Sequence, residues 1–183
     1  RAMDMNGTNA GNNIIMGNSF GLDAAGKPTL PNKDGIGINT GHTHNILGGY
    51  TAQEANVISG GDMCMRLSGA GIRNNIILGN TFMNLSGMGV YLEDGANRNF
   101  IQANDFSAMK ANLTAVRVDY GTGNLLRGNK VAANASRAVE LLENGNLELP
   151  APVITAASMY TITGSACSGC LVELYMQTTA GSV

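Results

Sequence analysis

The sequence predicts an all-β fold in which many short strands stack in a repeating series. The composition is the first observation, because glycine accounts for 25 of 183 residues, about twice its usual share, and charged residues are only 13%. Glycine, asparagine and β-branched residues are poor helix formers, and the Glu and Lys residues that solvent-facing helices need are scarce. An apolar fraction of 44% argues against a disordered chain. The second and third observations are two short patterns that recur along the chain.

An eight-residue motif is repeated with little change. It reads Asn, two apolar residues, one variable residue, one small residue, Asn, one polar residue and one large apolar residue. Complete copies occupy residues 13–20, 75–82, 99–106 and 124–131, and partial copies begin at Asn45 and Asn56. Successive copies are 24 or 25 residues apart in the second half of the chain and 30 or 32 before it, where residues 21–34 and 48–55 are expected to be loop insertions. Such a period indicates a repeat protein.

Short strands with alternating apolar residues keep the same rhythm. They lie at residues 36–38, 65–67, 90–92, 116–118 and 139–141. Alternation buries one face of a strand and leaves the other in water. Each period therefore holds about three short strands joined by Gly and Asn turns, and a unit buries its apolar face only by stacking on the next. Residues 1–148 are thus predicted to form a parallel β-helix of about five or six coils, with equivalent residues about 4.8 Å apart.

The repeats also resemble those of a known family. Segments such as NNIIMGNSFGLDAAG, NILGGYTAQEANVISG and NNIILGNTF are similar to the right-handed parallel β-helix proteins of the pectate-lyase-like superfamily, and more closely to the Asn/Gly-rich repeats of large bacterial surface proteins. The resemblance implies that Asn18, Asn80, Asn104 and Asn129 form a ladder of side-chain amides inside a turn. Sugar-binding amides are the alternative. The fold hosts lyases, hydrolases, adhesins and structural proteins, so it implies no particular activity.

Two columns of side chains are expected on the outer face of the alternating strands. The first contains Gly37, Arg66, Tyr91, Arg117 and Glu140, and the second contains Asn39, Ser68, Glu93, Asp119 and Leu142. We predict that Arg66, Tyr91, Arg117 and Glu140 form a binding surface.

Within these columns, Glu93 and Asp119, together with Arg117, are the best candidates for catalysis, because paired carboxylates carry out glycoside hydrolysis. The alternative is that mixed charges simply suit a stacked sheet. The catalytic patterns of the family's pectate lyases and polygalacturonases are missing, which favours a protein without enzymatic activity.

No metal site or cofactor is predicted. His42 and His44 alternate and could begin a transition-metal site, but a third ligand is missing nearby and a loop is the simpler interpretation. Cys167 and Cys170 precede a strand-like run, and we predict that they form a small disulfide that closes a turn. Cys64 lies beside an alternating strand and is expected to be a buried free thiol.

The composition changes near residue 149. Residues 149–183 contain three strand-like runs, at 153–155, 160–164 and 171–175, with Gly/Ser turns between them. They resemble the opening of a bacterial immunoglobulin-like sandwich domain. Because three strands cannot close a core, this segment is predicted to be an incomplete Ig-like domain.

Together these features favour a non-enzymatic structural or adhesive protein, located outside the cell or on its surface. Open strand edges favour head-to-tail association into a homo-oligomer, a filament or a surface layer. The alternative is a carbohydrate-active enzyme or a polysaccharide-binding module that uses the outward face. A net charge of −2 argues against nucleic acid as a partner, and without a run of about 20 apolar residues no membrane insertion is expected.

Overall fold

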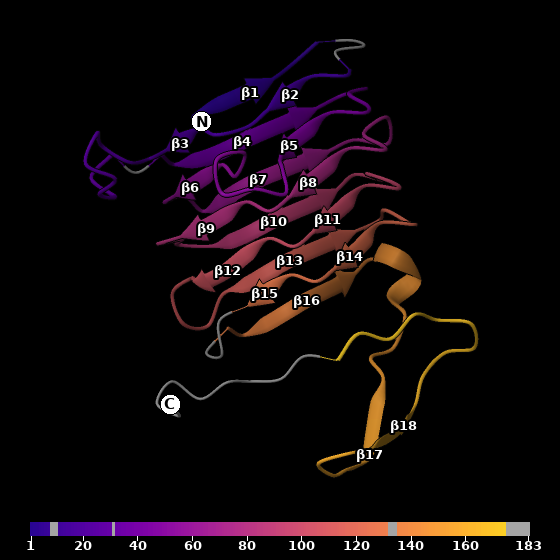
Figure 1. The fold of residues 1–183 in the computed structure, drawn as a ribbon. Helices are drawn as coiled ribbons and strands as arrows, with labels where there is room; N and C mark the ends of the chain where they lie inside the picture. The colour runs from indigo at the N-terminus through magenta and orange to yellow at the C-terminus, as the bar shows by residue number, and fades with distance from the viewer. Residues whose placement is uncertain (8–10, 31, 132–134, 175–183) are drawn as a thin grey trace.

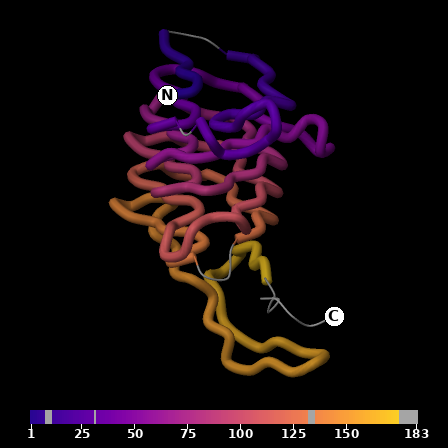
Figure 2. Tube along the Cα trace, turned by 90° about the vertical axis from the view of Figure 1, so that its left-hand side faces the viewer, coloured from indigo at the N-terminus to yellow at the C-terminus, as the bar shows by residue number. Residues whose placement is uncertain are grey.

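The computed structural model describes residues 1–7, 11–30, 32–131 and 135–174. The chain forms a parallel β-solenoid of about four turns, which confirms the predicted fold class (Figure 1). Three parallel sheets wrap around a common interior, and each turn contributes one strand to each sheet. The tube in Figure 2 shows the turns stacked along one axis, with the C-terminal segment below the last turn.

Sheet A is the longest of the three, and its strands match the alternating segments of the sequence. Its six strands, in sheet order, are β1 (Met3–Met5), β4 (Asp34–Asn39), β7 (Met63–Ser68), β10 (Met88–Glu93), β13 (Thr114–Asp119) and β16 (Arg137–Leu142).

The two halves of the eight-residue motif form sheets B and C. Sheet B contains β2 (Ile14–Ile15), β5 (Ile46–Gly48), β8 (Ile76–Leu78), β11 (Phe100–Gln102) and β14 (Leu125–Arg127). Sheet C contains β3 (Ser19–Phe20), β6 (Val57–Ser59), β9 (Thr81–Met83), β12 (Asp105–Ala108) and β15 (Lys130–Val131).

The number of turns is somewhat lower than the predicted five or six. One reason is that the partial motifs at Asn45 and Asn56 belong to a single turn. Asn45 precedes β5 in sheet B and Asn56 precedes β6 in sheet C, so the insertion between them widens one corner of the same turn. Insertions at a corner are tolerated because they leave the stacked strands in register.

The interior is filled by columns of apolar side chains, two of them from sheet A. In sheet C, the rings of Phe82 and Phe106 stack with centroids 4.6 Å apart and an interplanar angle of 13°. Ile58 continues this column between Phe20 and Phe82. Each of the three buried members is fully inaccessible to solvent, so the interior is a closed apolar core.

The predicted asparagine ladder is present and has one more member. Asn18 donates from Nδ2 to Oδ1 of Asn56 at 3.0 Å, and the series continues through Asn80 and Asn104 to Asn129 at 2.9 to 3.1 Å. The backbone N–H of each of the first four members donates to the same Oδ1 atom of the next. From Asn56 onward, Nδ2 also donates to a carbonyl of an earlier turn. An interior member thus fills both donor and both acceptor positions of its amide.

A second ladder, which the sequence analysis did not identify, runs along the corner between sheets A and B. It joins the first asparagine of every motif: Asn13, Asn45, Asn75, Asn99 and Asn124, with Nδ2 to Oδ1 distances of 2.8 to 3.2 Å. Asn146 extends it by one turn, because its Oδ1 accepts the backbone N–H of Asn124 at 3.0 Å.

The C-terminal segment leaves the solenoid after β16. A short 3₁₀ segment, η1 (Gly145–Glu148), carries Asn146, and an antiparallel hairpin follows, made of β17 (Val153–Ala157) and β18 (Ile162–Ser165). The first two predicted strand runs are therefore present. Residues 171–174 of the third run are not a strand, and residues 175–183 lie outside the described residues.

Residues 171–174 instead return to the end of sheet B (Figure 2). The backbone N–H of Gly128 donates to Glu173 at 2.8 Å, and Arg127 donates from Nε to the same carboxylate at 2.8 Å. In earlier turns the equivalent N–H groups of Gly79 and Ala103 donate to a backbone carbonyl of the next turn. The Glu173 carboxylate therefore stands in for the acceptor that a further turn would provide.

Candidate functional site

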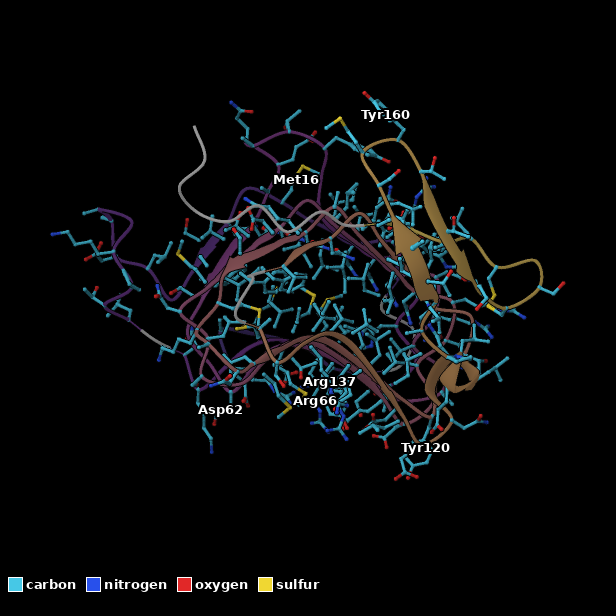
Figure 3. The ribbon with its side chains drawn as sticks, turned by 90° about the horizontal axis from the view of Figure 1, so that it is seen from below. Met16, Asp62, Arg66, Tyr120, Arg137 and Tyr160 are labelled. Atoms are coloured by element: carbon cyan, nitrogen blue, oxygen red, sulfur yellow. A yellow bond between two sulfur atoms is a disulfide. The ribbon has the colours of Figure 1, made fainter. Side chains whose placement is uncertain are left out.

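The outer face of sheet A carries the two columns that the sequence predicts. Register pairs Gly37 with Arg66, Arg66 with Tyr91, Tyr91 with Arg117 and Arg117 with Glu140. Figure 3 shows Arg66 on the same side of the solenoid as Arg137. The strands hold these side chains in place because their inward neighbours are locked in the core.

Arg66 pairs with Glu93 of the next turn. Its guanidinium contacts Oε1 of Glu93 through both Nε and Nη2. The Glu93 side chain is only 13% exposed. The predicted carboxylate is therefore bound to an arginine of the neighbouring strand.

Asp119 is held by two side chains. Arg117 donates to it from Nε and Nη2 at 3.0 and 2.8 Å, and the Tyr91 hydroxyl donates to Oδ2 at 2.7 Å. The guanidinium carbon of Arg117 also lies 5.4 Å from the centre of the Tyr91 ring, within the range of a cation–π contact. The three residues form one connected unit.

The electrostatics of this unit keep Asp119 ionised. Burial by itself would raise the pKa of Asp119, but the hydrogen bonds from Arg117 and Tyr91 more than offset this and lower it. Burial and the hydrogen bond to Asp119 raise the pKa of the Tyr91 phenol well above its usual range. A general acid in glycoside hydrolysis needs a raised carboxyl pKa, whereas the pKa of Asp119 is lowered. The side chains around Asp119 therefore form an ordered array of paired charges.

Glu140 extends the array toward the last turn. It lies 3.9 Å from Nη1 of Arg117 and accepts from Nη1 of Arg137 at 2.7 Å. Sequence reasoning missed Arg137, because it has the same parity as the inward residues Val139 and Leu141. On the last strand this face is partly exposed, so Arg137 reaches the surface.

Asp4 begins the first column at the opposite end. It pairs with Gly37 in register, bonds to Arg1 at 2.7 Å and accepts from Nδ2 of Asn39 at 2.8 Å. The alternation of Met3, Asp4 and Met5 was the signal that could have identified it.

The two histidines lie in different environments. His42 is fully buried, with Nδ1 at the Asn39 carbonyl oxygen, and its Nε2 meets no partner among the described residues. His44 is exposed, and its Nε2 lies 3.3 Å from Nδ2 of Asn74. In the part of the chain that the structure describes, no three His, Cys, Asp or Glu residues come together as a metal site.

Two of the three cysteines are bonded to each other and the third is free. Cys167 and Cys170 form a disulfide. Cys64 is a buried free thiol that donates to the Gly60 carbonyl at 2.8 Å, and burial raises its pKa to about 12.

A second surface, on the outer face of sheet B, was not anticipated. A cavity of about 290 Å³ lies between the corner insertion, with Tyr50 and Glu54, and the column that contains Ile46, Ile76 and Phe100. Tyr50 is 85% exposed and Phe100 is 39% exposed. Met16, which also lines it, lies on the opposite side of the molecule from Arg66 (Figure 3). The two apolar residues that follow the first Asn of each motif point to opposite faces of sheet B, so one of each pair points outward.

Comparison with known proteins identifies no family for this chain. No protein-family model matches the chain, and neither the curated proteins nor the solved structures contain a match. The described residues include no helix long and apolar enough to cross a membrane.

Proposed function

We propose that this protein is a non-enzymatic structural or adhesive β-solenoid that acts outside the cell or on its surface. The observation that carries the proposal is the pair of continuous asparagine ladders, in which interior members are fully buried and fully hydrogen-bonded. Fully satisfied buried polar networks rigidify a fold. A stiff rod suits a load-bearing or surface-presenting role.

The extracellular location is supported by the disulfide between Cys167 and Cys170. Disulfides persist in oxidising compartments and are rare in the cytosol. In keeping with this location, we assign the chain to the pectate-lyase-like superfamily, near the repeats of large bacterial surface proteins, and the hairpin β17–β18 to an Ig-like domain.

For this role, we propose that the protein self-associates as the subunit of a filament or a surface layer. The first strands β1, β2 and β3 each have a neighbouring strand on one side only, whereas at the opposite end of sheet B Glu173 takes up the N–H of Gly128. Such edges accept strands of another chain. The ladders have a direction as well, because each asparagine donates to the next turn, so one end of the stack offers acceptors and the other donors.

Light scattering over a range of protein concentrations tests this assembly. The wild-type mass should rise with concentration, whereas Ser19→Pro should lower it. In later turns the N–H at this position donates to the preceding turn, as Val57 does to the Asn18 carbonyl at 2.8 Å, so Ser19 offers its N–H at the edge. Ser19→Ala keeps that N–H and serves as the matched control. A constant monomer mass would overturn the assembly.

The alternative function is a carbohydrate-active enzyme or a polysaccharide-binding module on the outer face of sheet A. It is favoured by the ordered array around Tyr91 and Arg117, whose side chains are partly exposed. Binding and turnover on a panel of acidic and neutral polysaccharides test it. Loss of turnover in Glu93→Gln and Asp119→Asn would support an enzyme, and turnover that both variants retain would exclude these carboxylates.

A further inference from the structure

Exposed apolar side chains gather on two surfaces of the molecule. Among the described residues, 18 large hydrophobic side chains are exposed. Ten of them belong to residues 147–174, where Met159 and Tyr160, at the turn of the hairpin, are 87% and 91% exposed. Five more lie on or beside the outer face of sheet B: Ile14, Met16, Tyr50, Phe100 and Leu125. Apolar surface concentrated in this way marks places where a protein meets another molecule.

The cavity on the outer face of sheet B is long and almost without charge. Its lining comes from four successive turns, from Met16 after β2 to Phe100 of β11. Four adjacent strands span about 14 Å, because neighbouring strands lie about 4.8 Å apart. Among the described residues that line it, only Glu54 carries a charge, and its carboxylate accepts the backbone N–H of Thr51 in its own loop at 3.0 Å. The cavity therefore suits an elongated, uncharged apolar segment.

The hairpin β17–β18 has matching properties. Residues 150–172 contain no charged residue. Strand β17 has five residues and is therefore about 16 Å long. At the turn, the Met159 side chain is unbranched and adapts to irregular apolar gaps. The Tyr160 ring belongs to the residue types that dominate the energetics of protein–protein contacts. The hairpin and the cavity thus agree in length and in their lack of charge.

The hairpin lies past the last turn, on the same side of the solenoid as the cavity. Figures 1 and 2 show it below β16, at the opposite end from the first turns. Figure 3, which views the stack from below, shows Tyr160 on the side of Met16 and across the solenoid from Arg66. The hairpin is therefore on the side of sheet B but beyond the end of its own stack. A second copy, placed end to end below the first in the same orientation, would bring its cavity to this hairpin.

We propose that the hairpin β17–β18 of one copy docks in the sheet B cavity of the next copy. This inference rests on the self-association proposed above and names a contact that joins successive subunits. Because the two surfaces are different, the contact is heterologous, and every oligomer keeps a free hairpin at one end and a free cavity at the other. One aromatic side chain buries about 150–250 Å². The exposed side chains of the two surfaces are therefore numerous enough for a contact of standard size, about 1,200–2,000 Å² in total.

Sedimentation analysis of Tyr160→Asp and Phe100→Asp over a range of concentrations tests the proposal. Each variant places a carboxylate in one half of an apolar contact, where its desolvation is costly. Each should weaken self-association at least about thirtyfold, the factor lost with an interface hot spot. In an equimolar mixture, Tyr160→Asp still offers an intact cavity and Phe100→Asp an intact hairpin. The mixture should therefore form a dimer and nothing larger, because the dimer has no second intact pair of surfaces.

Tyr120→Asp is the matched control, because it makes the same change at a tyrosine that is 59% exposed after β13, away from both surfaces. It should change the association constant less than twofold, and melting temperatures verify that all variants fold. The hairpin contact is overturned if Tyr160→Asp and Phe100→Asp associate as the wild type does, or if their mixture stays monomeric. Loss of association in Ser19→Pro alone would then leave the edge assembly standing. A wild-type protein that stays monomeric would overturn both.

Discussion

The solenoid and the C-terminal hairpin are built from the same residue types, yet they bury them very differently. Ile36 and Ile38 of β4 are at most 1% exposed, whereas Ile154 of β17 and Ile162 of β18 are 56% and 49% exposed. Each solenoid strand has a neighbour on an adjacent turn and two further sheets across the core. The hairpin has only one partner strand. Stacking, rather than strand propensity, therefore stabilises this molecule.

The largest expected difference between the two regions concerns apolar truncation. Phe106→Ala should lower the free energy of unfolding by about 3–5 kcal/mol, because it leaves a cavity beside Phe82 in a closed core. Ile162→Ala in the hairpin should cost less than about 1 kcal/mol. Urea titrations followed by circular dichroism measure both. Equal losses would show that the hairpin is as well packed as the solenoid.

The ladders provide the next largest effect. Asn80→Ala should cost about 2–4 kcal/mol, because Asn56 loses the acceptor of two hydrogen bonds inside the core. Asn18→Ala, at the exposed first position of the same ladder, is the control and should cost about 1 kcal/mol. The same urea titrations apply. If both substitutions cost the same, burial is not what gives the ladder its stabilising effect.

The side chains on the outer face of sheet A are less buried than the core and more buried than the hairpin. A pH titration tests how much they contribute to stability. The lowered pKa of Asp119 means that its ionised form stabilises the fold. This contribution is present above the unfolded pKa of 3.8 and is lost as the pH falls through the lower folded pKa. Asp119→Asn should therefore be about 1–2 kcal/mol less stable near neutral pH. The gap should close as the pH falls through the lowered folded pKa of Asp119. A gap that persists unchanged in acid would contradict this assignment.

The smallest global effect is expected where the C-terminal segment meets the last turn. Glu173→Ala should cost less than about 1 kcal/mol, since Arg127 is half exposed. The amide of Gly128 should nevertheless exchange faster, because the variant removes its acceptor. The Ala103 amide, bonded to the Arg127 carbonyl at 3.0 Å, is the internal control. Hydrogen exchange measured by mass spectrometry distinguishes the two, and unchanged Gly128 exchange would exclude the capping role.

Much of the fold could be predicted because the repeat carries it. Alternation defined the strands of sheet A, and the two outward columns have the predicted register from Arg66 to Glu140. The ladder from Asn18 to Asn129 followed from the family resemblance. It lacked only Asn56, which the corner insertion moves out of the motif.

The candidate site was harder to predict, because a register gives neighbours but no side-chain contacts. Glu93 and Asp119 occupy equivalent places in the second column, yet each carboxylate is bound by an arginine of the first. Which arginine reaches which carboxylate depends on rotamers and on burial. Glu173 was beyond reach of any pattern, since its partner Arg127 is 46 residues away.

The sequence by itself determined the architecture: a regular spacing of asparagines and alternating apolar residues leaves few ways to bury the chain other than parallel stacking. Only the tertiary structure decided how the stack ends and how its surface charges combine. Asn146 and Glu173 complete the last turn from outside the repeat, while Arg66 and Arg117 each reach a particular carboxylate of the second column. The physical reason is that a repeat specifies contacts between equivalent residues, whereas caps and sites are made by residues that have no equivalent.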